Sequence, residues 1–302
     1  MNRATSLGPL ELRSPLVAAS GTVGSVYEWA EVADTRPYGA AVAKSVSGDP
    51  WPGRPAPRMA PAGIGMLNGI GIQNPGIAAW VGETAPRLAG LEVPVWGSAV
   101  GEHPDEFARV ARGLEEAGVT AIEVNLSCPN LEEGGMFALD PEASRVVVGR
   151  VREAVAIPIG AKLSPNSERV GDVAAACAEA GADFAVVANT VWGAAIDLDT
   201  RRPVLTGNVG GYSGAPVKPI ALRCVLEVRA AAPGLPIVGC GGVRTGADVV
   251  EFLMAGASAV EAGTVHFAEP KAGRRIMKEF DRWCDRHGVG SVAELVGAAE
   301  PW

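Results

Sequence analysis

Short apolar segments alternate along the chain with longer segments in which hydrophobic residues recur at helical spacing. Eight apolar segments end in small or polar residues and are almost wholly hydrophobic, which is typical of strands buried on both faces. They comprise residues 15–21, 39–47, 93–100, 121–128, 158–165, 184–190, 236–242 and 259–264. Helical spacing marks residues 103–118, 140–156, 167–181, 216–232 and 245–256, several of which end in Ala-Gly, where glycine can close a helix in the left-handed conformation.

This alternation predicts an α/β fold, a (β/α)8 TIM barrel, formed by residues 1–302 as a single domain. The strand ends are polar and none begins a GxGxxG turn, which favours the barrel over an open sheet. Two insertions interrupt the alternation: residues 48–76 after the second strand, rich in Pro and Gly, and residues 191–215 after the sixth, in which 194–198 and 202–205 predict a hairpin. Both follow the carboxyl ends of strands, so we expect them to wall the active site.

Composition excludes several classes of protein. The chain has 26 Lys and Arg against 34 Asp and Glu, and no segment concentrates Lys or Arg, which argues against nucleic acid or a membrane surface as partner. Its 5 cysteines are widely spaced without a CxxC pair, so neither a disulfide framework nor a metal site is indicated. A signal-peptide pattern is lacking, and apolar runs end before the ~18 residues of a membrane span, so a cytoplasmic protein is expected.

Polar residues and glycines at the strand ends should converge on one rim of the barrel. They include Ser20, Lys44, Ser45, Ser98, Asn125, Lys162, Asn189, Thr190, Gly241, Gly242, Gly263 and Thr264. Lys44 and Lys162 either pair with Asp or Glu, or bind an anionic ligand. The glycines, with Gly214, either cradle a phosphate through their N–H groups or only form tight turns, and their clustering favours the phosphate.

Several stretches resemble dihydroorotate dehydrogenases, in the family's order and over residues 20–297. They are NGIGIQNPG at 68–76, NLSCPN at 125–130, ANT at 188–190, Arg202-Pro203, Ser213-Gly214 with KPIALR at 218–223, and GCGG at 239–242. The Arg-Arg-Pro hairpin and the Lys-Pro-Ile-Ala-Leu-Arg helix start look most like the NAD-linked class 1B catalytic subunit of class 1. The resemblance implies FMN in the barrel mouth and oxidation of (S)-dihydroorotate to orotate in de novo pyrimidine (UMP) biosynthesis.

Cys128 matches the family's catalytic base, which removes a proton from the carbon α to a carbonyl. The resemblance places it before a mobile loop, residues 129–138, with Gly134 and Gly135 as the hinge. A thiolate can act as this base where positive charge or hydrogen-bond donors lower its pKa. The other four cysteines, Cys177, Cys224, Cys240 and Cys284, are expected to be inert buried thiols in helices or a strand interior.

The resemblance also assigns binding residues. Dihydroorotate would be bound by Lys44, Asn68, Gly69, Ile70, Gly71, Ile72, Asn125, Asn189 and Thr190. FMN would be bound by Ser20, Lys44, Ser45, Ser98, Asn125, Lys162, Ala188, Gly214, Gly241, Gly242, Gly263 and Thr264. The chain departs from the family at Ser98 (usually Asn), Gly69 (usually Ala) and Tyr212 (usually Leu), and its catalytic loop is about one residue short. These departures affect flavin hydrogen bonding and, with Trp192, substrate selectivity.

The class 1B resemblance also implies partners: a second copy of this chain in a homodimer, and an electron-transfer subunit that carries FAD and an iron–sulfur cluster. This chain has no group of cysteines that could hold such a cluster. NAD through that subunit, fumarate and a quinone stay open as electron acceptors. The alternatives in function are another FMN-dependent dihydropyrimidine dehydrogenase, whose substrate lacks the carboxylate, and a barrel lyase or isomerase with a lysine Schiff base on a phosphorylated metabolite. A barrel kept only to bind another flavoprotein is the non-enzymatic alternative.

Overall fold

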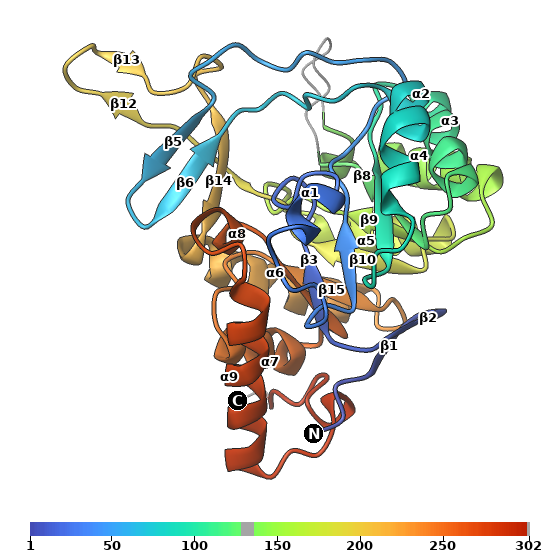
Figure 1. The fold of residues 1–302 in the computed structure, drawn as a ribbon, viewed down its shortest axis with the longest axis vertical. Coiled ribbons are helices and arrows are strands. Elements are labelled where there is room, and N and C mark those ends of the chain that lie inside the picture. The colour runs from blue at the N-terminus through green and yellow to red at the C-terminus, as the bar shows by residue number, and fades with distance from the viewer. Residues whose placement is uncertain (128–135, 301–302) are drawn as a thin grey trace.

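Eight parallel strands form a closed barrel in the computed structural model, which describes residues 1–127 and 136–300 (Figure 1). They are β3 (Leu16–Ala18), β4 (Ala40–Val42), β7 (Val95–Ala99), β8 (Ala121–Asn125), β9 (Ile159–Lys162), β10 (Phe184–Val187), β15 (Ile237–Cys240) and β16 (Ala259–Ala262). Each strand pairs with the next along this list, and β16 closes the barrel on β3. Every predicted strand segment contains one of them, so the predicted TIM barrel is confirmed.

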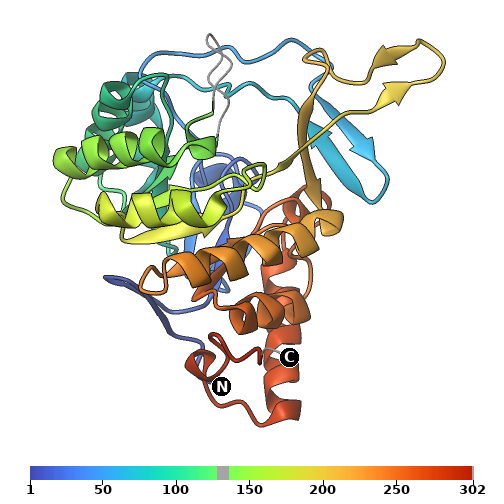
Figure 2. The same cartoon turned by 180° about the vertical axis from the view of Figure 1, so that it is seen from behind.

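The five predicted helices are also confirmed. They are α3 (Pro104–Glu116), α4 (Pro141–Ala154), α5 (Val170–Glu179), α6 (Lys218–Ala231) and α7 (Gly246–Ala255), and they cover the outside of the barrel (Figure 2). Local chemistry fixes their ends: the Asp140 side chain accepts hydrogen bonds from the N–H groups of Glu142 and Ala143, and Thr245 and Asp248 form a capping box. Gly256 ends α7 with a φ of 118°, as its Ala-Gly sequence predicts.

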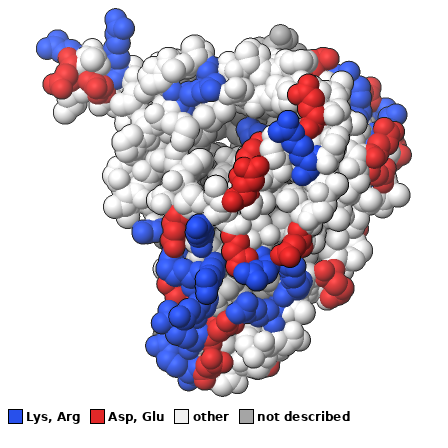
Figure 3. Space-filling view, in the orientation of Figure 1, with Lys and Arg blue, Asp and Glu red and all other residues white. Residues whose placement is uncertain are grey.

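Helix α9 (Ala272–His287) was not predicted, although its pattern is strongly amphipathic. Ile276, Met277 and Phe280 are buried on one face of the helix. On the other face, four exposed cations follow one another at intervals of four residues and so form a row along the helix. These cations are Arg274, Lys278, Arg282 and Arg286. Figure 3 shows Lys and Arg gathered over this helix. The expectation that no segment concentrates Lys or Arg is therefore wrong here, because acidic residues elsewhere in the chain hide the local excess.

The two insertions combine into one antiparallel sheet beyond the carboxyl ends of the barrel strands (Figures 1 and 2). Its order is β11 (Val191–Gly193), β14 (Gly210–Gly214), β6 (Gly65–Asn68) and β5 (Met59–Ala62). Asn68 of the first insertion pairs with Gly211 of the second. The predicted hairpin is present as β12 (Ile196–Asp197) and β13 (Arg202–Pro203), which project from this sheet. The shared sheet was not predicted.

The opposite end of the barrel carries a hairpin of β1 (Thr5–Leu7) and β2 (Leu10–Leu12), whose Leu7 and Leu12 join an apolar cluster with Trp96 and Phe184. This cluster fills the barrel interior below the site. The remaining elements are α1 (Tyr27–Ala30), α2 (Ile77–Ala79), α8 (Val265–Ala268), the π turn Trp80–Thr84, and the 3-10 turns Ala85–Leu88, Phe137–Leu139, Ala215–Val217 and Val292–Glu294. None of the helices in the described ranges combines the length and apolar character needed to cross a membrane.

Candidate active site

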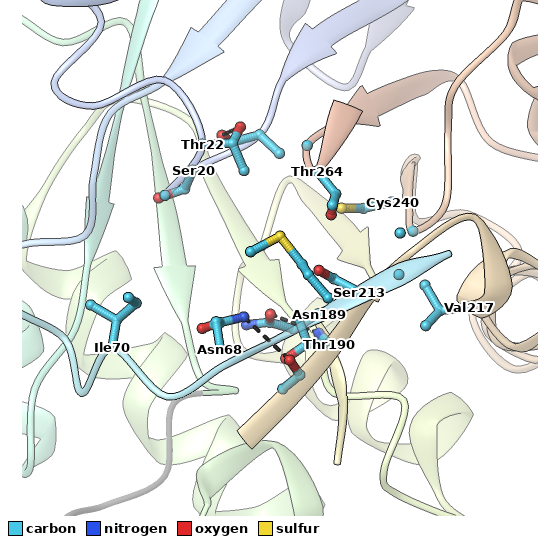
Figure 4. Close-up of a pocket in the computed structure, with 18 of the residues that line it drawn as sticks. Ser20, Thr22, Asn68, Ile70, Asn189, Thr190, Ser213, Val217, Cys240 and Thr264 are labelled. Carbon is cyan, nitrogen blue, oxygen red and sulfur yellow. Dashed lines mark hydrogen bonds between the residues drawn. The ribbon is translucent and has the colours of Figure 1, made fainter. Parts of the chain in front are cut away.

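A cavity of about 980 Å³ lies at the carboxyl ends of the barrel strands, beneath the sheet that the insertions form (Figure 4). Its walls come from segments far apart in the sequence: Ser20 follows β3, Asn189 follows β10, Thr264 follows β16, and Asn68 and Ser213 belong to the covering sheet. Parallel barrel strands all end at one rim, so the side chains that follow them are brought together. Both insertions therefore wall this cavity.

Most sequence-predicted site residues line this cavity. They are Ser20, Lys44, Ser45, Asn68, Gly69, Ile70, Gly71, Ile72, Asn125, Lys162, Ala188, Asn189, Thr190, Gly214, Gly241, Gly242, Gly263 and Thr264. Ser98 is an exception among the described residues, since it is fully buried behind Ser45 and hydrogen bonds to it, Oγ to Oγ, at 2.9 Å. A direct flavin contact from Ser98 is therefore not supported. Cys128, Gly134 and Gly135 lie outside the described residues.

A chain of hydrogen bonds fixes the amides on the cavity floor. Asn125 Nδ2 donates to Ser45 Oγ at 3.3 Å, and Ser127 Oγ donates to Asn125 Oδ1 at 2.8 Å. Asn189 Nδ2 donates to Ser127 Oγ at 2.6 Å, while Asn189 Oδ1 accepts the Thr190 N–H at 2.8 Å. Each amide is thereby held with its donor and acceptor ends in set directions, as recognition of a ring with alternating N–H and C=O groups requires.

Asn68 approaches the same region from the covering sheet. Its Nδ2 donates to the carbonyl oxygen of Gly211 at 3.3 Å, across the β6–β14 pair. In Figure 4, Asn68, Asn189 and Thr190 lie close to one another although they come from the sheet and from the barrel. The cavity therefore presents amide and hydroxyl groups on two opposing walls to a small polar ring.

Glycines form the other end of the cavity. Gly242 has a φ of 78°, and a Cβ there would lie 2.7 Å from the Cβ of Lys218, so no other residue fits without a shift. Within the described residues, the backbone N–H groups of Gly242, Val243 and Thr264 have no protein acceptor. Unpaired N–H donors beside Gly214, Gly241 and Gly263 provide what a phosphate group needs. This end of the cavity fits the phosphate of a mononucleotide.

Thr22, which sequence reasoning did not select, is held beside this glycine end. Its Oγ1 donates to the carbonyl oxygen of Ala19 at 2.8 Å and must therefore accept from His266 Nδ1 at 3.2 Å. His266 Nε2 in turn lies 2.9 Å from the hydroxyl of Tyr38. Burial lowers the pKa of His266 to about 4, so the ring is neutral and accepts the Tyr38 proton. The three residues support the wall without adding charge.

Lys162 pairs with glutamates, as one of the two sequence interpretations expects, and it also lines the cavity. Its Nζ lies 3.1 Å from Glu123 Oε2 and 2.7 Å from Glu261 Oε2. Burial opposes the charge on Lys162, but its acidic neighbours raise the pKa of the ammonium well above its ordinary value. Neither glutamate was among the predicted site residues. A single acidic residue within an otherwise apolar strand, as in AIEVN and AVEA, was the available signal, because such a residue requires a buried partner.

Cys240 was expected to lie in a strand interior, and this expectation is wrong. It ends β15 on the cavity wall, where burial raises the pKa of its thiol far above the ordinary value. Cys177, Cys224 and Cys284 are buried as expected, and burial raises their pKa values to about 12, 11 and 11. In the described residues no group of three or more His, Cys, Asp or Glu side chains is placed to hold a metal ion.

Large apolar side chains surround the cavity mouth and remain exposed. They are Met59, Ile64, Trp192, Val209 and Phe267, from the covering sheet, the adjoining loop and α8. We call them the apolar rim. Ile64 is the most exposed, at 78%. An apolar surface concentrated around a polar cavity is typical of a contact with another protein.

Comparisons with known proteins agree with the resemblance. A family model described as dihydroorotate dehydrogenase matches residues 3–283. The chain is 45% identical over 297 residues to the "Dihydroorotate dehydrogenase B (NAD(+)), catalytic subunit" of Pelobacter propionicus, covering 98% of this chain and 97% of that protein. It is 42% identical to the protein of the same name from Geobacter sp. strain M21, and 98% of each chain is covered. It is also 42% identical to the protein of that name from Desulforudis audaxviator, with 98% of this chain and 97% of that protein covered.

Proposed function

The chain belongs to the dihydroorotate dehydrogenase family, and we propose that it is the FMN-containing catalytic subunit of an NAD-linked member. As a member, it is an oxidoreductase that oxidises dihydroorotate in pyrimidine biosynthesis. The observation that carries the finer proposal is the cavity itself, in which amides stand at one end and unpaired N–H donors at a glycine cradle stand at the other. A polar ring and a phosphorylated cofactor need these two ends.

Family membership makes the enzyme flavin-dependent, and the cavity fits FMN. Gly214, Gly241, Gly242, Gly263 and Thr264 would hold the phosphate through their backbone N–H groups. The isoalloxazine end would be held by Ser20, Lys44, Ser45, Asn125, Lys162 and Ala188, and Ser98 would act only through Ser45. Bound FMN supplies a hydride acceptor.

The chain's own groups perform the remaining steps. Cys128 would take the proton from the carbon α to the substrate carbonyl onto Sγ, while the hydride leaves from the neighbouring carbon. Asn68, Asn125 and Asn189 would orient the ring by pairing with its N–H and C=O groups. Lys44 would balance the substrate carboxylate. The strands β5, β6, β11 and β14 cover the cavity and so limit access of water.

This geometry disfavours the Schiff-base alternative at Lys162. An amine must be neutral to attack a carbonyl, whereas two buried carboxyl groups hold Lys162 as an ammonium. Lys162 is thus an electrostatic group rather than a nucleophile. A dihydropyrimidine dehydrogenase with an uncharged substrate differs only at the carboxylate, and Lys44 is the residue that distinguishes the two.

The purified protein is expected to bind FMN noncovalently, at about one flavin per chain. Denaturation should release a flavin whose absorbance and mobility match those of FMN. Gly242→Val should weaken rebinding of FMN to the apoprotein, because the new side chain meets Lys218 and the backbone there has a φ of 78°. Gly149→Ala, at a half-buried position of α4 where an added Cβ would meet no other atom within 4 Å, is the control. A colourless protein that takes up no added FMN would contradict the proposal.

The relatives are named catalytic subunits, which supports a separate electron-transfer subunit for this chain. By the class 1B resemblance, that partner carries FAD and an iron–sulfur cluster. The apolar rim is the surface we assign to it, because electrons must leave the cavity and these exposed side chains surround its mouth. A homodimer of this chain is a separate proposal, which sedimentation of the purified protein tests.

Phe267→Asp in the apolar rim is expected to weaken binding of the electron-transfer subunit by at least tenfold, since it places a charge in a contact that excludes water. Reduction of the bound flavin by dihydroorotate should continue, whereas transfer of electrons to NAD should fall. The control is Leu226→Asp on α6, which is equally exposed, at 50% against 52%, but lies away from the cavity. Equal effects of the two variants on binding would move the interface elsewhere.

A further inference from the structure

Three ionisable side chains meet at the cavity floor, and only one of them is a cation. Glu123 and Glu261 both contact Lys162 Nζ, Glu123 from the neighbouring strand β8 and Glu261 from β16, which does not pair with β9. The side chains of Lys162, Glu123 and Glu261 are 6%, 1% and 0% exposed. We call them the Glu-Lys-Glu cluster. With both carboxyl groups ionised, it would carry one excess negative charge in the barrel interior, where water cannot stabilise it.

Lys162 is the one cation carried by the barrel strands within the described residues; Lys44, which also lines the cavity, lies beyond the end of β4. Cys240 on β15 is the other titratable group facing the cluster, and burial keeps its thiol protonated and neutral. Ser98 on β7 is the neighbour of Glu123 in the register, and Val17 on β3 is the neighbour of Glu261. Among the described residues, the charges that act most strongly on the pKa of Glu123 are those of Lys162 and Glu261. Within the described residues both glutamates form their ion pairs with Lys162 alone, so the excess negative charge is not balanced by a second ion pair.

A proton on one of the carboxyl groups would remove this excess. Two carboxyl groups that share one site rarely ionise together, because each raises the pKa of the other. Glu261 Oε1 is buried without a hydrogen-bond partner among the described residues, so full ionisation would leave an unpaired anionic oxygen. Burial raises the pKa of Glu123 to about 8; Lys162 acts against this rise, and Glu261 adds to it.

We propose that Glu123 and Glu261 are positioning residues for Lys162 and that together they hold one proton at neutral pH. The Glu-Lys-Glu cluster is then uncharged at pH 7 and gains one negative charge when this proton leaves. Glu123 and Lys162 line the cavity, whereas Glu261 lies behind them. The effect on a flavin, which rests on the proposed function, is that the added negative charge makes reduction less favourable above the pKa of the pair.

Infrared spectroscopy of the purified protein tests the proton directly and does not depend on a flavin. At pH 7 exposed Asp and Glu are ionised, so a C=O stretch of a protonated carboxyl group reports a buried one. The wild-type protein should show this band at pH 7 and lose it with an apparent pKa of about 8. Glu123→Gln and Glu261→Gln each leave one carboxylate paired with Lys162, a neutral pair, and both should lack the band.

Glu142→Gln, an exposed residue of α4, is the control and should retain the band. If a glutamine variant does not fold, methionine at the same position, similar in length and uncharged, gives the same expected loss. Absence of the band from the wild-type protein, or its persistence in either single variant, would overturn the proposal.

A second measurement reports the effect on the cofactor. The reduction potential of the bound flavin, followed against pH, should contain a step near pH 8 in the wild-type protein, and this step should be absent from both glutamine variants. If the glutamates had only a structural role, replacing them with glutamine would not remove this step from the pH dependence of the reduction potential. Retention of the step in the variants would overturn the proposal. A protein that binds no flavin would refute the proposed function while leaving the infrared result interpretable.

Discussion

Cys128→Ser is expected to slow reduction of the bound flavin by dihydroorotate roughly 10²- to 10⁴-fold at neutral pH, the range that a positioned general base contributes. A serine hydroxyl is a far weaker base than a thiolate near pH 7, so part of the rate should return at high pH. The measurement is anaerobic stopped-flow absorbance, in which bleaching of the flavin is followed after mixing with dihydroorotate. FMN binding should survive, because the assignment gives Cys128 no part in holding the cofactor.

The neighbourhood of this residue supports the expectation, although Cys128 itself lies outside the described residues. Ser127, which precedes it, is tied to Asn125 and Asn189 by hydrogen bonds of 2.8 and 2.6 Å on the cavity floor. Ser127 itself therefore lies on the cavity wall. Cys224→Ala is the matched control, since Cys224 is buried in α6 away from the cavity and should leave the rate unchanged. If Cys128→Ser reduces the flavin at the parental rate, another group is the base.

Lys44→Met is expected to weaken orotate binding strongly, by roughly 2 to 5 kcal/mol, the loss when one member of a buried charge pair is removed. That corresponds to about 30-fold to several-thousand-fold in Kd. The structure holds the backbone at this position from both sides: Lys44 N–H donates to the carbonyl oxygen of Gly24 at 2.9 Å, and Ser20 Oγ donates to that of Ala43 at 2.8 Å. Methionine keeps the length of the side chain and removes only its charge.

Titration of the oxidised protein with orotate, followed by the flavin spectrum, measures this effect. Lys44→Ala should be about as damaging as Lys44→Met, since charge rather than packing is required. Lys278→Met, on the exposed face of α9 outside the cavity, should bind orotate as the parent does. A dihydropyrimidine without the carboxylate should lose much less affinity. Unchanged orotate binding by Lys44→Met would shift the anion site to Lys162 or to the amides after Asn68.

The barrel could be predicted from the sequence because its signals are local. Strands buried on both faces must be apolar along their whole length, and the helices between them must have one apolar and one polar face. Both patterns can therefore be recognised within short segments of the sequence. The Ala-Gly and Thr-x-x-Asp ends of α7 are equally local, since they satisfy backbone groups within one turn. Helix α9 has the same kind of pattern and was also within reach.

Side-chain partners within the site could not be read from the sequence. Lys162 and Glu261 meet across the interior of the closed barrel, from strands β9 and β16 that do not pair with each other, and nothing near either residue specifies the other. Ser98 and Ser45 show a second limit: both lie at the expected strand positions, yet Ser45 lines the cavity, whereas Ser98 is fully buried and reaches it only through its hydrogen bond to Ser45. Depth along a strand end depends on how the barrel is staggered, which short patterns do not record.

The sequence by itself therefore determined the barrel, the rim on which the site lies, the family and many of the polar and glycine residues around the cavity. These follow from the periodicity of burial and from motifs whose residues are adjacent in the chain. Only the tertiary structure decided that Gly65–Asn68 and Gly210–Gly214 pair into a covering sheet, that Cys240 reaches the cavity wall, and that Lys162 is shared by two buried glutamates. Each of these depends on contacts between distant segments, whose energies are set by burial and charge in three dimensions rather than by local sequence.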